Sequence, residues 1–276
     1  MEPTTGLVLV DSHAHLTMFP PGEVPALLDR AAGAGVWGVV VPATGAADLD
    51  AVLSLGVEYP NRILVAVGVH PHEASSLDAG LKRRLRKCLA ESGAVAVGEI
   101  GLDYHYMSSP REDQLTALQW QLDLAASAGM PVILHNRDSW SDLAPALRAR
   151  EGRLRGVCHS FAEGTQAAAT VVELGLKVGI SGMVTFKGGD NVRSIVRSLA
   201  PEHLLVETDS PYLAPTPHRG KQNEPAYVIE TARVVAHELG CTLKEIALAT
   251  TTNVRSLFQT GPTWPLVGDP GITEQS

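Results

Sequence analysis

The sequence contains few cysteines and no pairing pattern among them. Its 276 residues include only three, Cys88, Cys158 and Cys241, which lie far apart and form no CxxC motif. An odd number of widely spaced cysteines does not suit a disulfide framework. We therefore expect reduced thiols in a reducing compartment, which predicts a cytoplasmic location.

Long apolar runs and a basic start are also missing. No apolar segment approaches the roughly 20 residues needed to cross a bilayer, and residues 1–6 carry an acid where a secretory signal carries basic residues. We expect a soluble protein with no membrane contact. The formal charge of −8 argues against a broad electrostatic surface for duplex nucleic acid, but not against a small pocket in which metal ions supply positive charge.

The sequence has neither an interdomain linker nor a glycine-rich phosphate loop. Gly and Pro are scattered as turn residues, and no G-x-G-x-x-G or Walker motif occurs. The length fits one α/β barrel, which commonly takes about 250 residues, although two smaller domains would also fit. We predict a single domain over residues 1–260, followed by a C-terminal tail over residues 261–276 that lies on or off the surface.

Apolar, β-branched runs alternate along the chain with segments of helical spacing. The runs predict eight strands, at Leu7–Val10, Val36–Val41, Ile63–Val69, Val95–Val97, Val132–Leu134, Leu154–Cys158, Leu176–Ile180 and Leu204–Val206. Helical spacing occurs, for example, in Glu23–Ala34, Ser76–Ala90, Arg111–Ala128 and Asp190–Leu199. Strands that are apolar throughout indicate burial on both faces, so we predict an α/β protein with a (β/α)8 TIM-like barrel.

An open, doubly wound sheet would show the same alternation, and the placement of polar residues decides between the two folds. Candidate metal ligands follow the ends of five different predicted strands. An open sheet would instead gather its ligand contacts at one switch point. The candidate ligands are His13, His15, Glu99, His135, His159 and Asp209.

The first candidates form an H-x-H motif. Residues two apart on a strand point the same way, so His13 and His15 would both face the barrel mouth, although an isolated pair could simply cap a strand. Glu99 lies close to glycines on both sides, which leaves room beside a carboxylate that is able to bridge two cations. The alternative for Glu99 is an N-cap or a surface acid.

Further ligands follow later strands. His135 and His159 each end a buried run and would complete the nitrogen ligands, but either could be a buried histidine that bonds a backbone carbonyl. Asp209 is the expected ligand and general base, because a carboxylate beside a bound water can orient it and take its proton. Glu207 shares its face and is expected to hydrogen-bond a ligating histidine. Cys158 should face the helices and serve only in packing.

Other polar residues fall in the same loops. His70 is expected to contact the substrate or the leaving group, whereas His72 could equally be a surface residue. Arg137 and Arg219 could bind an anionic group in a bidentate manner, although solvated arginines are as common. Asp103 is expected to be a helix cap or an acceptor behind the ligands.

Six such ligands fit two cations better than one. Two cations about 4 Å apart can generate a hydroxide and hold both the attacked group and the departing oxygen. Four imidazoles favour Zn or Mn over Mg, which prefers oxygen ligands. The expected cofactor is therefore a pair of divalent metal ions, Zn, Mn or Mg.

Several motifs, taken in order, make the chain resemble the TatD family of metal-dependent deoxyribonucleases in the amidohydrolase superfamily. They are DSHAHL at 11–16, GVHPH at 68–72, GEIGLDY at 98–104, LHNRD at 134–138, ETDSPYL at 207–213 and RGKQNEP at 219–225. The resemblance covers nearly the whole chain. It implies a TIM-like barrel and two metal sites that share Glu99. The ligand sets that it implies are His13, His15, Glu99 and Asp209 for one cation, and Glu99, His135 and His159 for the other.

The resemblance also implies hydrolysis of DNA from a 3′ end, with His70 near the scissile phosphate. Two positions depart from the family pattern. The family usually shows His-Cys-Phe-Ser-Gly where this chain has HSFAEG at 159–164, which places the acid Glu163 near the expected phosphate. Gln222 stands where a basic residue is common, which removes one possible phosphate contact. Neither departure touches the expected metal ligands.

The leading hypothesis is a metal-dependent hydrolase of phosphodiester bonds, a 3′–5′ exodeoxyribonuclease acting on DNA 3′ ends or another phosphate ester. Its catalytic residues would be Asp209, Glu99 and His70. The alternative is an amidohydrolase-type esterase or deacylase that attacks a carbonyl, for example to remove an amino acid from a tRNA 3′ end. Many such relatives have a modified lysine at the position that Glu99 occupies in this chain. The presence of a glutamate there favours phosphate chemistry over attack on a carbonyl. The intact ligand set argues against a noncatalytic scaffold, and the sequence indicates no oligomeric state.

Overall fold

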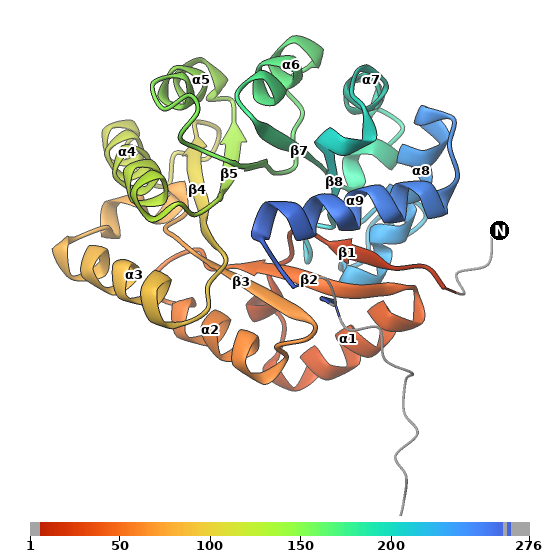
Figure 1. Ribbon diagram of the computed structural model, residues 1–276, viewed down its shortest axis with the longest axis horizontal. Coiled ribbons are helices and arrows are strands. Elements are labelled where there is room, and N and C mark those ends of the chain that lie inside the picture. The colour runs from red at the N-terminus through yellow and green to blue at the C-terminus, as the bar shows by residue number, and fades with distance from the viewer. Residues whose placement is uncertain (1–5, 262–263, 266–276) are drawn as a thin grey trace, which may run out of the picture.

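Eight parallel strands form a barrel in the computed structural model, which describes residues 6–261 and 264–265. Each strand pairs with the next in chain order, and a ring of helices surrounds them (Figure 1). The strands are β1 Leu9–Asp11, β2 Val36–Pro42, β3 Ile63–Val67, β4 Ala96–Asp103, β5 Val132–Arg137, β6 Gly156–Cys158, β7 Leu176–Ile180 and β8 Leu204–Val206. The predicted single-domain (β/α)8 fold is therefore confirmed.

The α-helices follow the strands in alternation. They are α1 Val24–Gly33, α2 Leu49–Glu58, α3 Ala79–Glu91, α4 Arg111–Ala128, α5 Trp140–Arg148, α6 Thr165–Glu173, α7 Asp190–Ser198, α8 Val228–Leu239 and α9 Leu243–Phe258. Helix α9 begins with a capping box between Thr242 and Glu245, and α4 ends at Gly129, whose φ of 63° suits a residue without a side chain. None of the described helices is long and apolar enough to cross a membrane.

Strands β4 and β5 extend further than the sequence predicted. Their ladder continues through the pairs Gly101 with His135 and Asp103 with Arg137, so His135 lies inside a strand instead of after one. The register shifts between Val97 and Ile100, and Glu99 sits at this irregularity. The predicted ends at Val97 and Leu134 were wrong because backbone hydrogen bonds, which do not depend on side-chain polarity, carry the pairing past the apolar runs.

Other boundaries also differ. β1 and β6 begin two residues later than predicted, at Leu9 and Gly156, and β3 ends at Val67 instead of Val69. Residues 71–76 form a 3-10 helix, and α3 begins only after Asp78, whose side chain accepts a hydrogen bond from the Leu81 N–H. Asp78 is therefore the N-cap of α3.

The interior of the barrel is filled by apolar side chains from alternate strand positions. Val40 points inward, whereas its neighbours Val39 and Val41 pack against the helices. The inward cluster joins Val10, Val40, Ala66, Ala96, Ile133, Val157 and Leu205 to Val254, Leu257 and Phe258 of α9. Helix α9 contacts β1 and β8 and runs across the barrel in Figure 1, so it closes the end opposite the polar site.

Trp264 lies within the predicted C-terminal tail but is not on the surface. It is only 8% exposed and belongs to the same inward cluster, with its ring against Gly38. A side chain at position 38 would collide with this ring, because an added Cβ would lie 2.7 Å from it. Trp264 is therefore packed into the barrel, whereas the tail as a whole stays a prediction. Residues 262–263 and 266–276 of the predicted tail lie outside the described residues.

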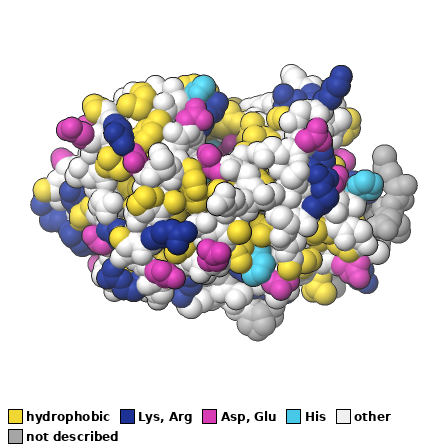
Figure 2. Space-filling view, turned by 90° about the horizontal axis from the view of Figure 1, so that it is seen from above, with side chains coloured by type: hydrophobic (Ala, Val, Ile, Leu, Met, Phe, Trp, Pro, Cys, Tyr) yellow, Lys and Arg dark blue, Asp and Glu magenta, His cyan; other side chains and the backbone are white. Residues whose placement is uncertain are grey.

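The outer wall carries charges of both signs. Figure 2 shows Lys and Arg side chains interspersed with Asp and Glu side chains over one side of the helix ring. On this face the basic side chains are therefore not gathered into one patch.

Candidate metal centre

The barrel is closed at its mouth by contacts between the segments that follow β1 and β8. Ser12 N–H donates to Val206 O at 3.1 Å, and Ala14 forms a single bridge with Ser210. Buried Asp11 adds side-chain bonds, because its carboxylate accepts from the N–H and the hydroxyl of Thr208 at 2.9 and 2.5 Å. These contacts bring His13 and His15 to the same place as Asp209.

Asp209 has a left-handed backbone with a φ of 58°, which is uncommon for a residue other than glycine. Bonds on both sides hold this conformation. Asp209 N–H donates to His13 O at 2.9 Å, and the Ser210 N–H donates to the Thr208 hydroxyl at 3.1 Å. We call the contacts of Asp11 with Thr208, and of Thr208 with Ser210, the Asp11–Thr208 clamp.

Glu99 lies at the centre of the histidines, and its two carboxylate oxygens face different ones. Oε2 lies 3.2 Å from His13 Nε2 and 3.5 Å from His15 Nε2. Oε1 lies 2.8 Å from His159 Nε2 and 2.9 Å from His135 Nδ1. The register shift in β4 allows this buried side chain to reach both pairs. Glu99 therefore separates the donors into two groups.

The first group is completed by Asp209. Its Oδ1 lies 3.5 Å from His15 Nε2 and 3.9 Å from His13 Nε2. One donor atom from each of these three residues fits within 4.8 Å of the others, a spacing that could hold a cation. All six predicted ligands therefore converge at one end of the barrel.

His70 lies beside the second group. Its Nε2 is 3.5 Å from Glu99 Oε1, and one donor atom each from His70, Glu99 and His135 also fits within 4.8 Å. His70 can therefore reach either a cation or a substrate. Burial lowers the pKa of His70 to about 4, although Glu99 opposes this shift, so the imidazole is neutral near pH 7.

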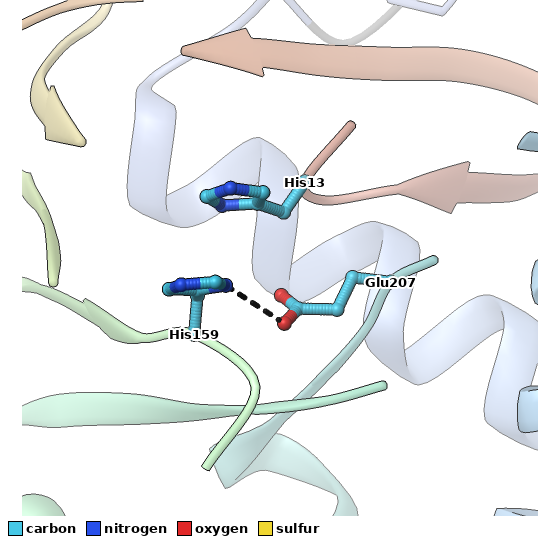
Figure 3. Close-up of side chains that lie close together, drawn as sticks. All are labelled: His13, His159 and Glu207. Atoms are coloured by element: carbon cyan, nitrogen blue, oxygen red, sulfur yellow. Dashed lines mark ion pairs between the residues drawn. The ribbon is translucent and has the colours of Figure 1, made fainter. Parts of the chain in front are cut away.

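Buried acids support the histidines from behind. Glu207 Oε1 lies 3.4 Å from His159 Nδ1, which is an ion-pair distance, but the predicted hydrogen bond between the two is not formed. Figure 3 shows the rings of His13 and His159 stacked, with centroids 3.9 Å apart, and Glu207 beside His159. Asp103 Oδ2 lies 3.2 Å from His135 Nε2 and 2.9 Å from His72 Nε2. Asp103 is thus an acceptor behind the ligands and not a helix cap, since Pro110 precedes α4.

The electrostatics of the centre depend on the pairing of carboxylates with imidazoles. Burial alone would raise the pKa of Glu99, but the surrounding histidines hold it well below its usual value. Burial would likewise lower the pKa of His159, but Glu99 and Glu207 raise it well above its usual value. Among the described residues, no Lys or Arg forms an ion pair with Glu99 or Asp209. Buried Glu99 and partly buried Asp209 are therefore paired only with imidazoles in the described part of the chain.

This donor chemistry fits divalent cations. Histidines bind a metal as neutral imidazoles, so a divalent cation would then balance the charges of Glu99 and Asp209. Nitrogen and carboxylate oxygen donors together are the usual ligands of Zn and similar ions. The Nδ1 atoms of His13 and His15 are buried without a hydrogen-bond partner in the described part of the chain. No acceptor at Nδ1 therefore stabilises the protonated form of either ring.

The centre opens into a cavity of about 1160 Å³. Arg137 and Arg219 line it, and each also packs on an aromatic ring, Tyr106 at 4.8 Å and Phe186 at 3.9 Å respectively. Their binding of an anionic group stays a prediction. Glu163 lines the cavity too, and its carboxylate accepts from Asn136 Nδ2 at 2.7 Å. Gln222 is exposed and is not among the lining residues.

Comparison with known proteins identifies the family. The model of the TatD related DNase family matches residues 10–259. The chain belongs to the TatD family. An uncharacterized metal-dependent hydrolase, TatD of Mycobacterium tuberculosis, is 35% identical over 92% of this chain and 98% of its own length. YjjV of Escherichia coli K12 is 37% identical over 90% of this chain and 97% of its own length.

Solved structures agree with this assignment. The crystal structure of the E. coli TatD homologue YjjV has a TM-score of 0.86 and 34% identity, and the match covers 92% of this chain and 98% of that one. A TatD-family hydrolase from Entamoeba histolytica, at 22% identity and a TM-score of 0.80 over 91% of this chain and 98% of its own, shares the fold. This TatD-family protein is therefore a metal-dependent hydrolase.

Proposed function

We propose that this TatD-family hydrolase cleaves phosphodiester bonds and acts as a 3′–5′ exodeoxyribonuclease at DNA 3′ ends. The observation that supports the proposal most strongly is the division of the Glu99 oxygens between two histidine pairs. Oε2 faces His13 and His15, whereas Oε1 faces His135 and His159. A carboxylate placed in this way is able to bridge two cations.

In this proposal the residues divide into two ligand sets that share Glu99. His13, His15 and Asp209 would hold one divalent ion, and His135 and His159 would hold the other. When bound, a pair of Zn, Mn or Mg ions supplies an activated water and neutralises the charge that develops on the phosphate. Four imidazole donors favour Zn or Mn.

Asp209 would act as the general base. Its carboxylate lies beside the first histidine pair and lines the cavity, so it reaches the place where a water would attack a bound phosphate. Although burial would raise its pKa, its bond to His15 and the nearby histidine charges lower it below the usual value. The group is therefore ionised at neutral pH and able to accept a proton.

His70, Arg137 and Arg219 would bind the substrate. Because His70 is neutral, its imidazole can donate a hydrogen bond to a phosphate oxygen without adding a charge. Both arginines line the cavity, and planar guanidinium groups suit bidentate binding of phosphate. Their contacts with Tyr106 and Phe186 would restrict their motion before the substrate binds.

The alternative function is removal of an acyl group from an ester, for example an amino acid from a tRNA 3′ end. Glu163 is the observation that favours it. This carboxylate stands on the cavity wall, where it would repel a phosphate but would attract the ammonium group of an amino acid. The same Asp209 would then take a proton from the water that attacks a carbonyl.

One experiment separates these functions. The Mn- or Mg-loaded protein is incubated with single-stranded DNA labelled at either end, and in parallel with an aminoacylated RNA. Progressive loss from the 3′ end that disappears in Glu99→Gln supports the exonuclease. DNA that stays intact at full metal occupancy, together with release of the amino acid, would assign the protein to the alternative function.

A further inference from the structure

Exposed apolar side chains gather at the mouth of the barrel. Six large apolar side chains are exposed among the described residues, and three of them, Met18, Tyr106 and Tyr212, stand beside the metal centre. All three line the cavity. Single exposed apolar residues are normal on a protein surface, but their concentration around one cavity marks a contact site.

Tyr212 belongs to one side of this mouth. It follows Asp209 by three residues, and its ring lies 6.4 Å from that of His15, edge to face. Its hydroxyl lies 3.3 Å from Met18 Sδ, so the two side chains form one apolar surface over the loops after β1 and β8. The Tyr212 side chain nevertheless remains 53% exposed.

Tyr106 belongs to the other side, in the loop after β4. Its ring lies 5.5 Å from His72, edge to face, and the Arg137 guanidinium lies over it at 4.8 Å. These contacts hold the ring, yet Tyr106 is 59% exposed. Tyr106 and Tyr212 both line the cavity into which Glu99 and Asp209 also point.

We propose that Tyr106 and Tyr212 stack unpaired bases of a single-stranded substrate on the two sides of the scissile phosphate. This inference rests on the proposed phosphodiesterase function and identifies the side chains that would receive the bases. Aromatic rings are the usual platforms for unpaired bases, and they accept any base because every base has a π-face. Bases inside a duplex are already stacked on one another and cannot lie on these rings. Arg137 reinforces the Tyr106 platform with a positive charge.

Binding can be tested without turnover. The probes are two short oligo-dT strands whose last linkage is a phosphorothioate that resists cleavage, one with a normal 3′-terminal base and the other with an abasic 3′ terminus. Their dissociation constants are measured by fluorescence anisotropy for the metal-loaded wild type, for Tyr106→Ala and Tyr212→Ala, and for Tyr106→Phe and Tyr212→Phe. Leu248→Ala on α9 is the matched control, because it removes an exposed apolar side chain far from the mouth.

We expect the wild type to bind the strand with the terminal base about 5- to 150-fold more tightly, as one stacked base contributes. Because the terminal base lies on one side of the scissile phosphate, the alanine variant of the tyrosine on that side should lose this preference. The other alanine variant should bind both strands more weakly by a similar factor, whereas the phenylalanine variants and Leu248→Ala should match the wild type. Equal wild-type affinity for the two strands would overturn the inference, even if DNA is cleaved. A different outcome is that the wild type shows no base preference but self-associates in sedimentation, and that Tyr106→Ala or Tyr212→Ala reduces this association. That result would assign the tyrosines to a contact between copies of the chain. A clear base preference without cleavage would leave the stacking intact and refute only the exonuclease.

Discussion

The carboxylate of Asp11 binds both the N–H and the hydroxyl of Thr208, a residue 197 positions away in the sequence. Through this pair the end of the first strand holds the segment that carries Asp209. Neither residue lines the cavity. The geometry of the centre therefore depends on groups that do not contact the substrate.

Replacing Asp11 with alanine should destabilise the protein and disturb the centre together. The change leaves the buried Thr208 N–H without its acceptor, which costs about 1–3 kcal/mol of the free energy of unfolding. Denaturant unfolding measures this loss. Asp50→Ala, a change at an exposed carboxylate on α2, is the control and should stay within about 0.5 kcal/mol. Equal stability of both variants would show that the Asp11–Thr208 clamp contributes nothing.

Replacing Asp209 with asparagine should lower kcat much more than it raises KM. The amide keeps the size of the side chain but cannot take a proton, and a general base contributes about 10²- to 10⁴-fold to the rate. Steady-state kinetics on the same single-stranded DNA measures both constants. Glu163→Gln is the comparison, since removal of a repelling charge should lower KM and leave kcat unchanged. Equal changes in kcat and KM for Asp209→Asn, with reduced metal content, would mean that Asp209 mainly holds the metal.

The pH dependence of activity should not carry the signature of an ordinary histidine at position 70. Burial disfavours the charged imidazolium and lowers the pKa of His70 to about 4, so protonation begins only as the pH falls toward that value. Between about pH 5 and 8, His70→Asn should reduce kcat/KM by a constant factor. The measurement is kcat/KM as a function of pH for the wild type and for His70→Asn. An inflection near pH 6.5 that is present in the wild type and absent in the variant would contradict the lowered pKa of His70.

Cys158 should resist alkylation in the folded protein. It is fully buried, and burial raises the pKa of its thiol to about 12, so almost no thiolate forms at pH 8. Cys88 and Cys241 are partly exposed and should react with iodoacetamide. Peptide mass spectrometry after labelling should find Cys158 unmodified until a denaturant is added. Equal labelling of all three cysteines under native conditions would be inconsistent with this packing.

The barrel and the convergence of its polar residues could be predicted from the sequence. Apolar runs reveal strands that are buried on both faces, and in a parallel barrel their ends must meet at one mouth, which places His13, Glu99 and His159 together. The strand ends could not be predicted in the same way. Glu99 and His135 read as residues beyond the strands, but backbone pairing between β4 and β5 continues past them.

Features that depend on distant partners were missed. Asp11 is read from sequence as part of a motif, and only the fold shows that Thr208 completes its hydrogen bonds. Tyr106 and Tyr212 carry no periodic signal, because exposure at a rim follows from loop geometry and not from pattern. The burial of Trp264 was missed for a related reason, since a Pro- and Gly-rich segment does not indicate that one of its rings fills the end of a barrel.

Helix α9 and Trp264 pack the end of the barrel that lies opposite the metal centre. This packing bears on how a substrate reaches the centre and how the products leave it. Among the described residues the packed end leaves the cavity at the mouth as the opening to the centre. If the protein acts as the proposed exonuclease, the substrate and both products would share this opening, and a released nucleotide would leave before the shortened strand advances. Each cycle is therefore expected to end with an exchange at the entrance, and a high concentration of free mononucleotide should slow it by competing for that same opening.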